Sequence, residues 1–408
     1  MQRVLIAHQV GDAKIHDRPR GNLSDLYPRW LGAREFLLHQ RNPYGKGVAR
    51  EIQAGYYGRP LDPSRPADPK DEQGFAYPLY VILFLAPTVG LPFAIVQKAL
   101  FYLLVLLTSA TVLLWIRILR WPAACSTQIG LVLLTLGSLA TLQGLLLQQI
   151  SLFVAGLLAI AILLFITNHP ISAGILFAAA TIKPQLVFLL LCWLALWTFS
   201  DWRRRYPWLA SFLATMTILF ATSEWLLPHW IPSFYHAIRD YQKYTGNVSI
   251  LDALLHKPWS SILEFIALSA TVIACWRERH QPANSQTFAA ILCLVLAVTV
   301  LLIPSASTYN HVFLIPALLL LAKERHSIWE KSPASRIFFA LMAALLCWPW
   351  VSSVVLAALS FFLPPFSFNR AWAMPTWTLS PIPVAVSALM LLSYYHLTFS
   401  APPTPPSS

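Results

Sequence analysis

The first 77 residues of this 408-residue chain are polar and rich in Arg, Asp and Pro, whereas apolar runs recur from Tyr80 to Thr398 almost without interruption. Many of these runs approach the ~20 residues that an α-helix needs to cross a bilayer. Hydrophobic residues make up 57% of the chain and charged residues only 11%, which excludes a water-soluble fold. The runs are continuous rather than alternating, which excludes a transmembrane β-barrel. We therefore predict an all-α polytopic membrane protein.

Basic residues gather where apolar runs end, and this sets the expected orientation of the chain. The net charge is +12, and clusters such as Arg203-Arg204-Arg205 and Lys323/Arg325 flank apolar runs. Cytoplasmic ends of membrane helices are enriched in Lys and Arg. The clusters therefore predict the cytoplasmic side, and they give no reason to expect a nucleic-acid partner. The segments 1–77, 228–260 and 359–379 are then expected on the extracytoplasmic side.

The chain divides into three predicted parts. Residues 1–77 are expected to form an extracytoplasmic loop, residues 78–399 a helical bundle of about eleven spans, and the Pro-rich residues 400–408 a disordered tail. Residues 78–90 predict a re-entrant or interfacial segment. A break at Lys183-Pro184 divides a hairpin whose two halves are too short to cross fully, which suggests irregular backbone facing a cavity. The predicted spans are 92–118, 128–147, 150–167, 170–182, 184–200, 206–227, 261–277, 285–304, 311–323, 336–358 and 380–399.

The polar first loop is expected to contain short helices at the membrane surface. Residues 24–40 place their apolar side chains at helical spacing, which is typical of an amphipathic helix lying on a membrane. Ser24 or Asp25 can cap that helix. Residues 48–57 predict a second short helix, and five prolines between residues 60 and 78 predict a loop without regular structure.

Ionisable residues at polar breaks are the candidates for chemistry. Asp25 is a candidate catalytic carboxylate, and its alternative role is that of a helix cap. Lys183 lies between apolar runs, where a charge is costly enough to suggest a function; the alternative is that its ammonium reaches the membrane surface. Arg29, one helical turn after Asp25, can bind phosphate or the Asp25 carboxylate, or remain a surface charge. Gln148-Gln149 is a weaker polar candidate.

Four phrases occur in a fixed order along the chain: SDLYPRWLGAREFLLHQRNPY (24–44), GFAYPLYVILFLAPTVGLP (74–92), AGILFAAATIKPQLVFLL (173–190) and STYNHVFLIPALLLL (307–321). Their order and spacing resemble glycosyltransferase family 87, the polyprenol-phosphate-sugar-dependent transferases of the GT-C superfamily. The resemblance implies a GT-C-like helical bundle. Members of the family carry a span before the Asp, whereas only 24 polar residues precede Asp25 here. Either Met1 is not the biological start or this chain lacks that first helix.

The resemblance also implies roles for individual residues. Asp25 matches the family's general base, which takes the proton of an attacking sugar hydroxyl. His311 and Lys183 match elements expected to bind the donor phosphate, and we add Arg29 as a third candidate there. Apart from the resemblance, the aromatic rings of Tyr44, Tyr77 and Trp30 are expected to stack on sugar or isoprenoid, and Tyr309 is expected to contact substrate as well. The alternatives are an interfacial histidine without a task and tyrosines of an aromatic belt.

The expected activity is transfer of a mannose-like hexose from a polyprenyl-phosphate donor to a glycolipid or polysaccharide acceptor. The enzyme would work at the extracytoplasmic face of a bacterial plasma membrane. We expect no cofactor and no metal ion, because the donor carries its own activated leaving group. A transporter or flippase of lipid-linked sugars is the alternative, although it would favour internal repeats and charges within spans. A non-catalytic scaffold is a third possibility if the first helix is absent.

Overall fold

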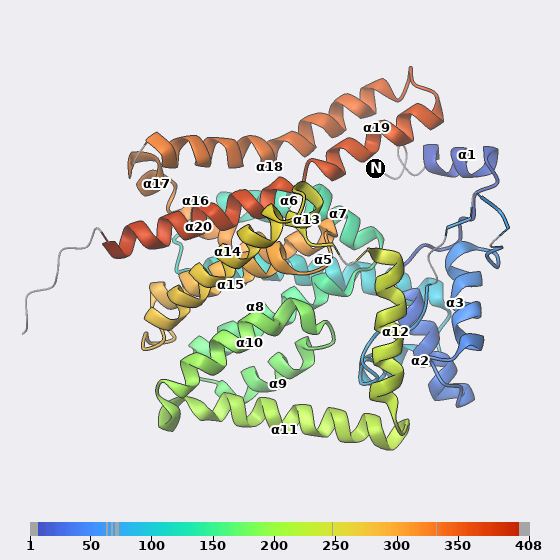
Figure 1. The fold of residues 1–408 in the computed structure, drawn as a ribbon, viewed down its shortest axis with the longest axis horizontal. Coiled ribbons are helices and arrows are strands. Elements are labelled where there is room, and N and C mark those ends of the chain that lie inside the picture. Colours follow the sequence, from blue (N-terminus) through green and yellow to red (C-terminus); the bar gives the residue numbers. More distant parts are fainter. Residues whose placement is uncertain are drawn as a thin grey trace, which may run out of the picture.

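The computed structural model describes residues 7–62, 64–66, 68–69, 73–246, 248–331 and 333–399, and every regular element in these ranges is helical. The predicted all-α class is confirmed. The predicted tail, residues 400–408, lies outside the described residues. Long helices run roughly side by side to form the body of the molecule, and shorter helices cross one end of it (Figure 1).

The N-terminal part holds five short elements: α1 (Ala7–Ile15), α2 (Tyr27–His39), α3 (Lys46–Tyr57), α4 (Val81–Leu85) and the 3₁₀ helix η2 (Ala86–Thr88). Helix α3 confirms the second predicted helix, and the described part of 60–78 contains no helix, as its prolines predict. Helices α2 and α3 lie across the long helices, together with α12 (Trp230–Thr245) (Figure 1).

Each of the eleven predicted spans corresponds to an apolar helical segment. The bundle consists of α5 (Phe93–Ile118), α6 (Cys125–Gly137), α7 (Leu139–Leu146), α8 (Ile150–Ile166), α9 (Pro170–Ala180), α10 (Pro184–Phe199), α11 (Trp202–Leu226), α14 (Trp259–Arg277), α15 (Gln286–Leu302), η3 (Thr308–Leu314), α16 (Ile315–Lys323), α18 (Pro333–Leu359) and α20 (Pro381–Phe399). The connecting helices are α13 (Ile250–Leu254), α17 (Arg325–Lys331) and α19 (Pro365–Trp377).

These segments differ in whether they are long enough to cross a bilayer. Five described helices have the length and hydropathy of a span, and the pair α6–α7, bent by 60°, would make a sixth. The segments 150–166, 170–180, 184–199, 286–302 and 308–323 are apolar but shorter. The sequence counted about eleven spans and expected only 170–182 and 184–200 to be too short to cross fully; the number of full crossings stays a prediction.

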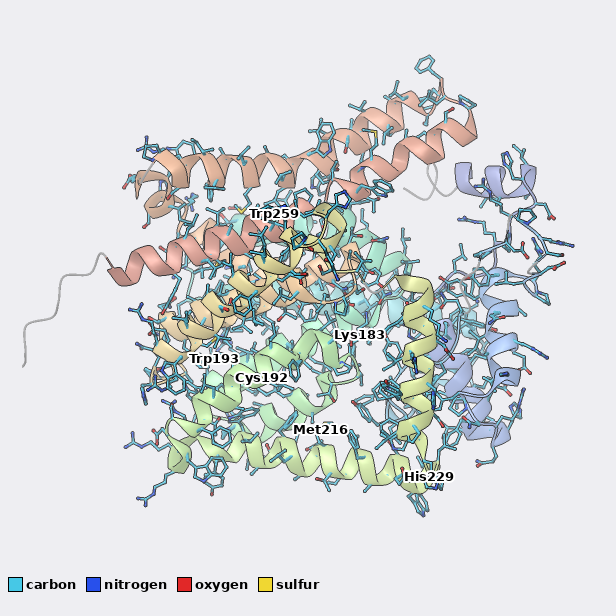
Figure 2. The ribbon with its side chains drawn as sticks, in the orientation of Figure 1. Lys183, Cys192, Trp193, Met216, His229 and Trp259 are labelled. Atoms are coloured by element: carbon cyan, nitrogen blue, oxygen red, sulfur yellow. The ribbon has the colours of Figure 1, made fainter. Side chains whose placement is uncertain are left out.

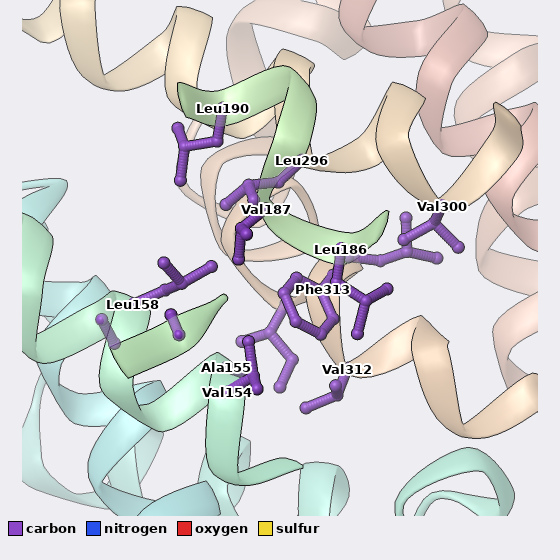
Figure 3. Packing of buried hydrophobic residues seen from close by; sticks show 14 of the residues in the cluster. Val154, Ala155, Leu158, Leu186, Val187, Leu190, Leu296, Val300, Val312 and Phe313 are labelled. Atoms are coloured by element: carbon purple, nitrogen blue, oxygen red, sulfur yellow. The ribbon is translucent and has the colours of Figure 1, made fainter. Parts of the chain in front are cut away.

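The core gathers around α15, whose side chains are buried on every side between Phe288 and Leu301. A helix that is apolar all round belongs in the interior of a helical protein. Figure 3 shows its Leu296 and Val300 beside Val187 of α10 and Phe313 of η3. Helix α11 is the opposite case, because only 6% of the residues in its most apolar stretch are buried inside the protein. Its remaining apolar surface fits contact with lipid.

Glycine lets two helices of the bundle approach closely. A Cβ atom on Gly174 of α9 would collide with Ser211 Oγ and with the Trp208 carbonyl oxygen of α11. Small residues commonly permit such contact between membrane helices. Gly174 therefore fixes how closely the α9–α11 pair packs.

Helix α2 differs from its prediction in two respects. Neither Ser24 nor Asp25 caps it, because the N-cap residue is Leu26, which makes no side-chain capping bond. Its apolar face is covered by protein rather than left for lipid: the rings of Tyr27 and Trp30 pack against Phe93. The physical reason is tertiary, since Ser24 and Asp25 form hydrogen bonds to the turn between α7 and α8.

Candidate functional site

The turn between α7 and α8 binds the segment that carries Asp25. The Asp25 backbone N–H donates to the Leu147 carbonyl oxygen at 2.8 Å. The Ser24 hydroxyl donates to Gln148 Oε1 at 2.6 Å. Gln148 has a φ of 49°, a left-handed conformation that few residues other than glycine adopt, so the turn is tight. Two contacts thus hold Asp25 against the start of α8.

The partly buried carboxylate of Asp25 has a donor for each oxygen. The side-chain amide of Gln149 donates to Oδ2. The Tyr56 hydroxyl of α3 lies 3.4 Å from Oδ1, which is long for an O–H···O hydrogen bond. Gln149 therefore donates to Oδ2, whereas Oδ1 has only the long contact with Tyr56. The capping role proposed for Asp25 is excluded, because its carboxylate points to α8 and α3.

Lys183 occupies the break between α9 and α10 and is buried, with 7% of its surface exposed. Its ammonium donates to Gln149 Oε1 at 3.0 Å and to Ser151 Oγ at 2.7 Å. The same Nζ lies 5.0 Å from the centroid of the Tyr309 ring. Figure 2 shows Lys183 toward the end of the bundle where α12 lies. The alternative in which this lysine reaches the membrane surface is wrong, because the ammonium is bound inside the protein.

Arg29 and Tyr77 form a second cationic element. The Arg29 guanidinium carbon lies 4.3 Å from the centroid of the Tyr77 ring. Within the described part of the chain, Arg29 Nε and the Tyr77 hydroxyl are buried and have no hydrogen-bond partner. Burial raises the pKa of Tyr77, so its hydroxyl stays a donor at neutral pH. Buried polar groups without partners are rare in folded proteins, and these two are suited to a bound ligand.

Tyr44 stands behind Tyr77 rather than beside the ligand space. Its hydroxyl donates to the Tyr77 carbonyl oxygen at 2.7 Å, and its ring packs edge-on against Phe75. Burial raises the pKa of Tyr44, which keeps this hydroxyl protonated as the bond requires. Tyr44 therefore supports the position of Tyr77.

A cavity of about 480 Å³ joins these elements. Its volume falls within the ~300–1,000 Å³ of typical small-molecule sites. Arg29, Tyr77, Lys183 and Tyr309 line it, and α12 closes one side. The residues that α12 contributes are Phe234, Ile238, Tyr241 and Gln242. Asp25 does not line the cavity, but Gln149 connects its carboxylate to Lys183, so the cavity holds two cations and has a carboxylate behind one of them.

His311 lines a different space. It is buried on η3, and its Nε2 has no partner in the described part of the chain. It borders a second cavity of about 380 Å³, which is lined mainly by apolar side chains of α6, α7, α16, α18 and α20. A 3₁₀ helix has three residues per turn, so the side chains of Tyr309 and His311, two residues apart, point in directions about 120° apart. The structure therefore brings Lys183, Arg29, Tyr77 and Tyr309 together and places His311 on another face of η3.

Several residues of the site were not singled out from the sequence. Gln149 was only a weak candidate, and Tyr56, Ser151 and Asn310 were not candidates at all. Ser151 donates to Asn310 Oδ1 at 2.8 Å, which extends the polar network from Lys183 to η3. The available signal was the polar pair Gln149 and Ser151 at the start of an otherwise apolar span. Within the described residues, no group of three His, Cys, Asp or Glu side chains is placed to hold a metal ion.

The arrangement can accept a proton at Asp25 and hold an anion at Lys183 and Arg29. Comparison with protein families shows that residues 75–304 match glycosyltransferase family 87. The match includes Tyr77 and Lys183, whereas Asp25, Arg29 and His311 lie outside it. Comparisons with curated proteins and with solved structures found no match. Since the matched range covers more than half of the chain, the protein belongs to glycosyltransferase family 87 and is a membrane glycosyltransferase.

Proposed function

We propose that the protein transfers a mannose-like hexose from a polyprenyl-phosphate donor to a glycolipid or polysaccharide acceptor at the extracytoplasmic face of a bacterial plasma membrane. One observation carries the proposal: the Asp25 carboxylate and the Lys183 ammonium are bound to the two ends of one amide, that of Gln149, beside a polar cavity. A base and a cation at this spacing suit a hydroxyl nucleophile on one side and a phosphate leaving group on the other.

In the proposed reaction the acceptor hydroxyl oxygen attacks the anomeric carbon of the donor sugar. The hydroxyl proton passes to Asp25, and the bond between the anomeric carbon and the phosphate oxygen breaks. The electron pair of that bond leaves with polyprenyl phosphate, so the products are the glycosylated acceptor and the lipid phosphate. Direct attack inverts the configuration at the anomeric carbon.

The donor phosphate is assigned to the cavity wall that holds Lys183, Arg29 and Tyr77. An ammonium with two protein partners keeps a third N–H to donate, and the unpartnered Arg29 Nε and Tyr77 hydroxyl add two more donors. Bonds from charged donors to phosphate are the stronger class of hydrogen bond. The isoprenoid chain is assigned to the apolar cavity, with His311 at its polar edge.

The proposed sidedness rests on the distribution of charge along the bundle. Arg205 donates to the carbonyl oxygens of Arg279 and His280, so two basic clusters meet at one end of the long helices. Figure 1 shows the loops that follow α10 and α14 at the opposite end from α2, α3 and α12. Basic residues mark the cytoplasmic side. The candidate site is thereby assigned to the extracytoplasmic end.

The test uses the purified full-length protein in proteoliposomes with a membrane glycolipid fraction as acceptor. Radiolabelled polyprenyl-phosphate mannose is offered in one reaction and radiolabelled nucleotide-linked mannose in another. Label should enter the acceptor from the lipid-phosphate donor alone. Incorporation from the nucleotide sugar, or movement of intact lipid-linked sugar across the bilayer without transfer, would overturn the proposal.

A further inference from the structure

The side-chain amide of Gln149 stands between the carboxylate of Asp25 and the ammonium of Lys183. Its Nε2 donates to Asp25 Oδ2, and its Oε1 accepts from Lys183 Nζ at 3.0 Å. An ammonium can only donate and a carboxylate can only accept. The amide therefore has a single possible orientation, with its oxygen toward Lys183 and its nitrogen toward Asp25.

The backbone holds this amide in place. Gln149 precedes the first residue of α8, and only 2% of its surface is exposed. Its backbone N–H donates to the Gly144 carbonyl oxygen at 2.8 Å, which anchors it to α7. The neighbouring Gln148 is bound to Ser24 and to Gln97, so the turn is attached on both sides. A buried amide with this support has little freedom to turn away from Asp25.

We propose that Gln149 is the positioning residue for Asp25 and keeps it apart from Lys183. The proposal rests on the proposed function, in which Asp25 is the general base. Because Gln149 holds Oδ2, the weakly bonded Oδ1 is the oxygen that receives the acceptor proton. Because the amide separates the two charges, Lys183 does not form an ion pair with the base. Its third N–H is left for the donor phosphate.

The test compares Gln149→Met with Gln143→Met in the full-length protein. Methionine is close to glutamine in size but cannot make either hydrogen bond. Misplacing a reacting group can cost about 10²-fold in rate, so kcat in Gln149→Met should fall by that order while the donor KM changes by less than about threefold. Gln143 accepts a hydrogen bond from Thr308 and touches neither charge, so Gln143→Met should keep the wild-type kcat.

A second measurement separates positioning from general support of the fold. In an Asp25→Asn background, adding Gln149→Met should change the residual rate by less than about twofold, since residues that act as a unit are not additive. Gln149→Glu, which keeps a partner for Lys183 but repels Asp25, should also lower kcat. The same fold-loss in both backgrounds, or wild-type kcat in Gln149→Met, would overturn the role of Gln149.

The activity of the wild-type protein and that of Gln149→Met are measured side by side. Wild-type protein is assayed first with polyprenyl-phosphate mannose and acceptor. An inactive wild type rejects the function, whereas an active wild type with an equally active Gln149→Met rejects only the positioning role. Each variant is compared by size-exclusion chromatography in detergent, so a loss of rate counts only when the elution profile matches that of the wild type.

Discussion

The Arg29 guanidinium lies 4.3 Å above the ring of Tyr77, and the two side chains form a wall of the polar cavity with buried donor atoms that bind nothing in the described part of the chain. The stacking fixes the plane of the guanidinium, as expected for a cation over an aromatic face. A phosphate entering the cavity would meet donors that are already oriented.

Replacing Tyr77 with Phe removes one such donor and leaves the ring under Arg29. Donor KM should rise by about 10- to 150-fold, because a hydrogen bond to a charged group contributes roughly 1.5–3 kcal/mol. Burial raises the pKa of Tyr77 above its ordinary value of 10.0, so the hydroxyl stays protonated up to that pH. The ratio of wild-type to Tyr77→Phe activity should therefore stay constant between about pH 7 and 9. A ratio that falls toward one as the pH rises from 8 to 9 would contradict this role.

Asp25→Asn keeps the shape of the side chain and removes the proton acceptor. Transfer should fall by ~10² to 10⁴, the usual contribution of a general base. Expression and membrane insertion should not change, because asparagine can still accept from Gln149. Turnover is measured with both substrates saturating. Wild-type turnover in the variant would remove Asp25 from the mechanism.

Lys183→Ala and His311→Ala should both weaken the use of donor more than the use of acceptor. The loss for Lys183 should be the larger, ~1.5–3 kcal/mol for one charge-assisted bond, because Lys183 lines the polar cavity and His311 the apolar one. Initial rates are measured against donor concentration, with Lys183→Arg as a variant that keeps the charge. An unchanged donor dependence in Lys183→Ala would make this lysine a structural partner of Ser151.

The orientation of the chain can be tested with an impermeant thiol reagent on intact cells. Asp68 is a poor labelling position, since it is buried against Arg59 with an N–O distance of 2.6 Å. Ser64 and Arg204 are exposed. In a chain without its native exposed cysteines, Ser64→Cys should react from outside and Arg204→Cys only after permeabilisation. The opposite result would place the candidate site in the cytoplasm.

Gly174→Ala should lower the thermal midpoint of the detergent-solubilised protein. The added Cβ collides with the Trp208 carbonyl oxygen of α11, which belongs to a helix backbone and cannot move alone. Overpacking of this kind costs ~1–3 kcal/mol. Gly130→Ala is the matched control, because a Cβ atom at Gly130 would have nothing within 4 Å. If both variants had the same thermal midpoint, the close contact between α9 and α11 at Gly174 would not contribute to the stability of the protein.

The sequence predicted the helices of the bundle because apolar runs mark them directly, whatever their tertiary partners. It singled out Lys183 because an ammonium between apolar runs is costly, and Asp25 through the family resemblance; the chemical roles of both residues stay predictions. It did not predict α12, which lies within a segment interpreted as an outer loop. The segment has the amphipathic composition of a surface helix. The sequence does not show that this helix lies over the cavity and contributes to its wall.

The errors at the site share one physical origin. The capping role suggested for Asp25 follows from local preferences, whereas the observed contact joins Asp25 to Gln149, 124 residues along the chain. Local patterns cannot encode which distant turn a polar side chain meets. His311 was matched to the donor phosphate by its place in the phrase STYNH, whereas Tyr309 and His311 lie on different faces of η3 and border different cavities.

The 124-residue separation of Asp25 and Gln149 has a consequence for biogenesis. The ribosome releases the Asp25 segment long before α8, and the segment stays without its partner until α5 through α8 have entered the membrane. A nascent or prematurely terminated chain therefore displays the acid without the amide that orients it. The contact between Asp25 and Gln149 therefore cannot form before the start of α8 has been synthesised, although Asp25 itself is among the first residues made.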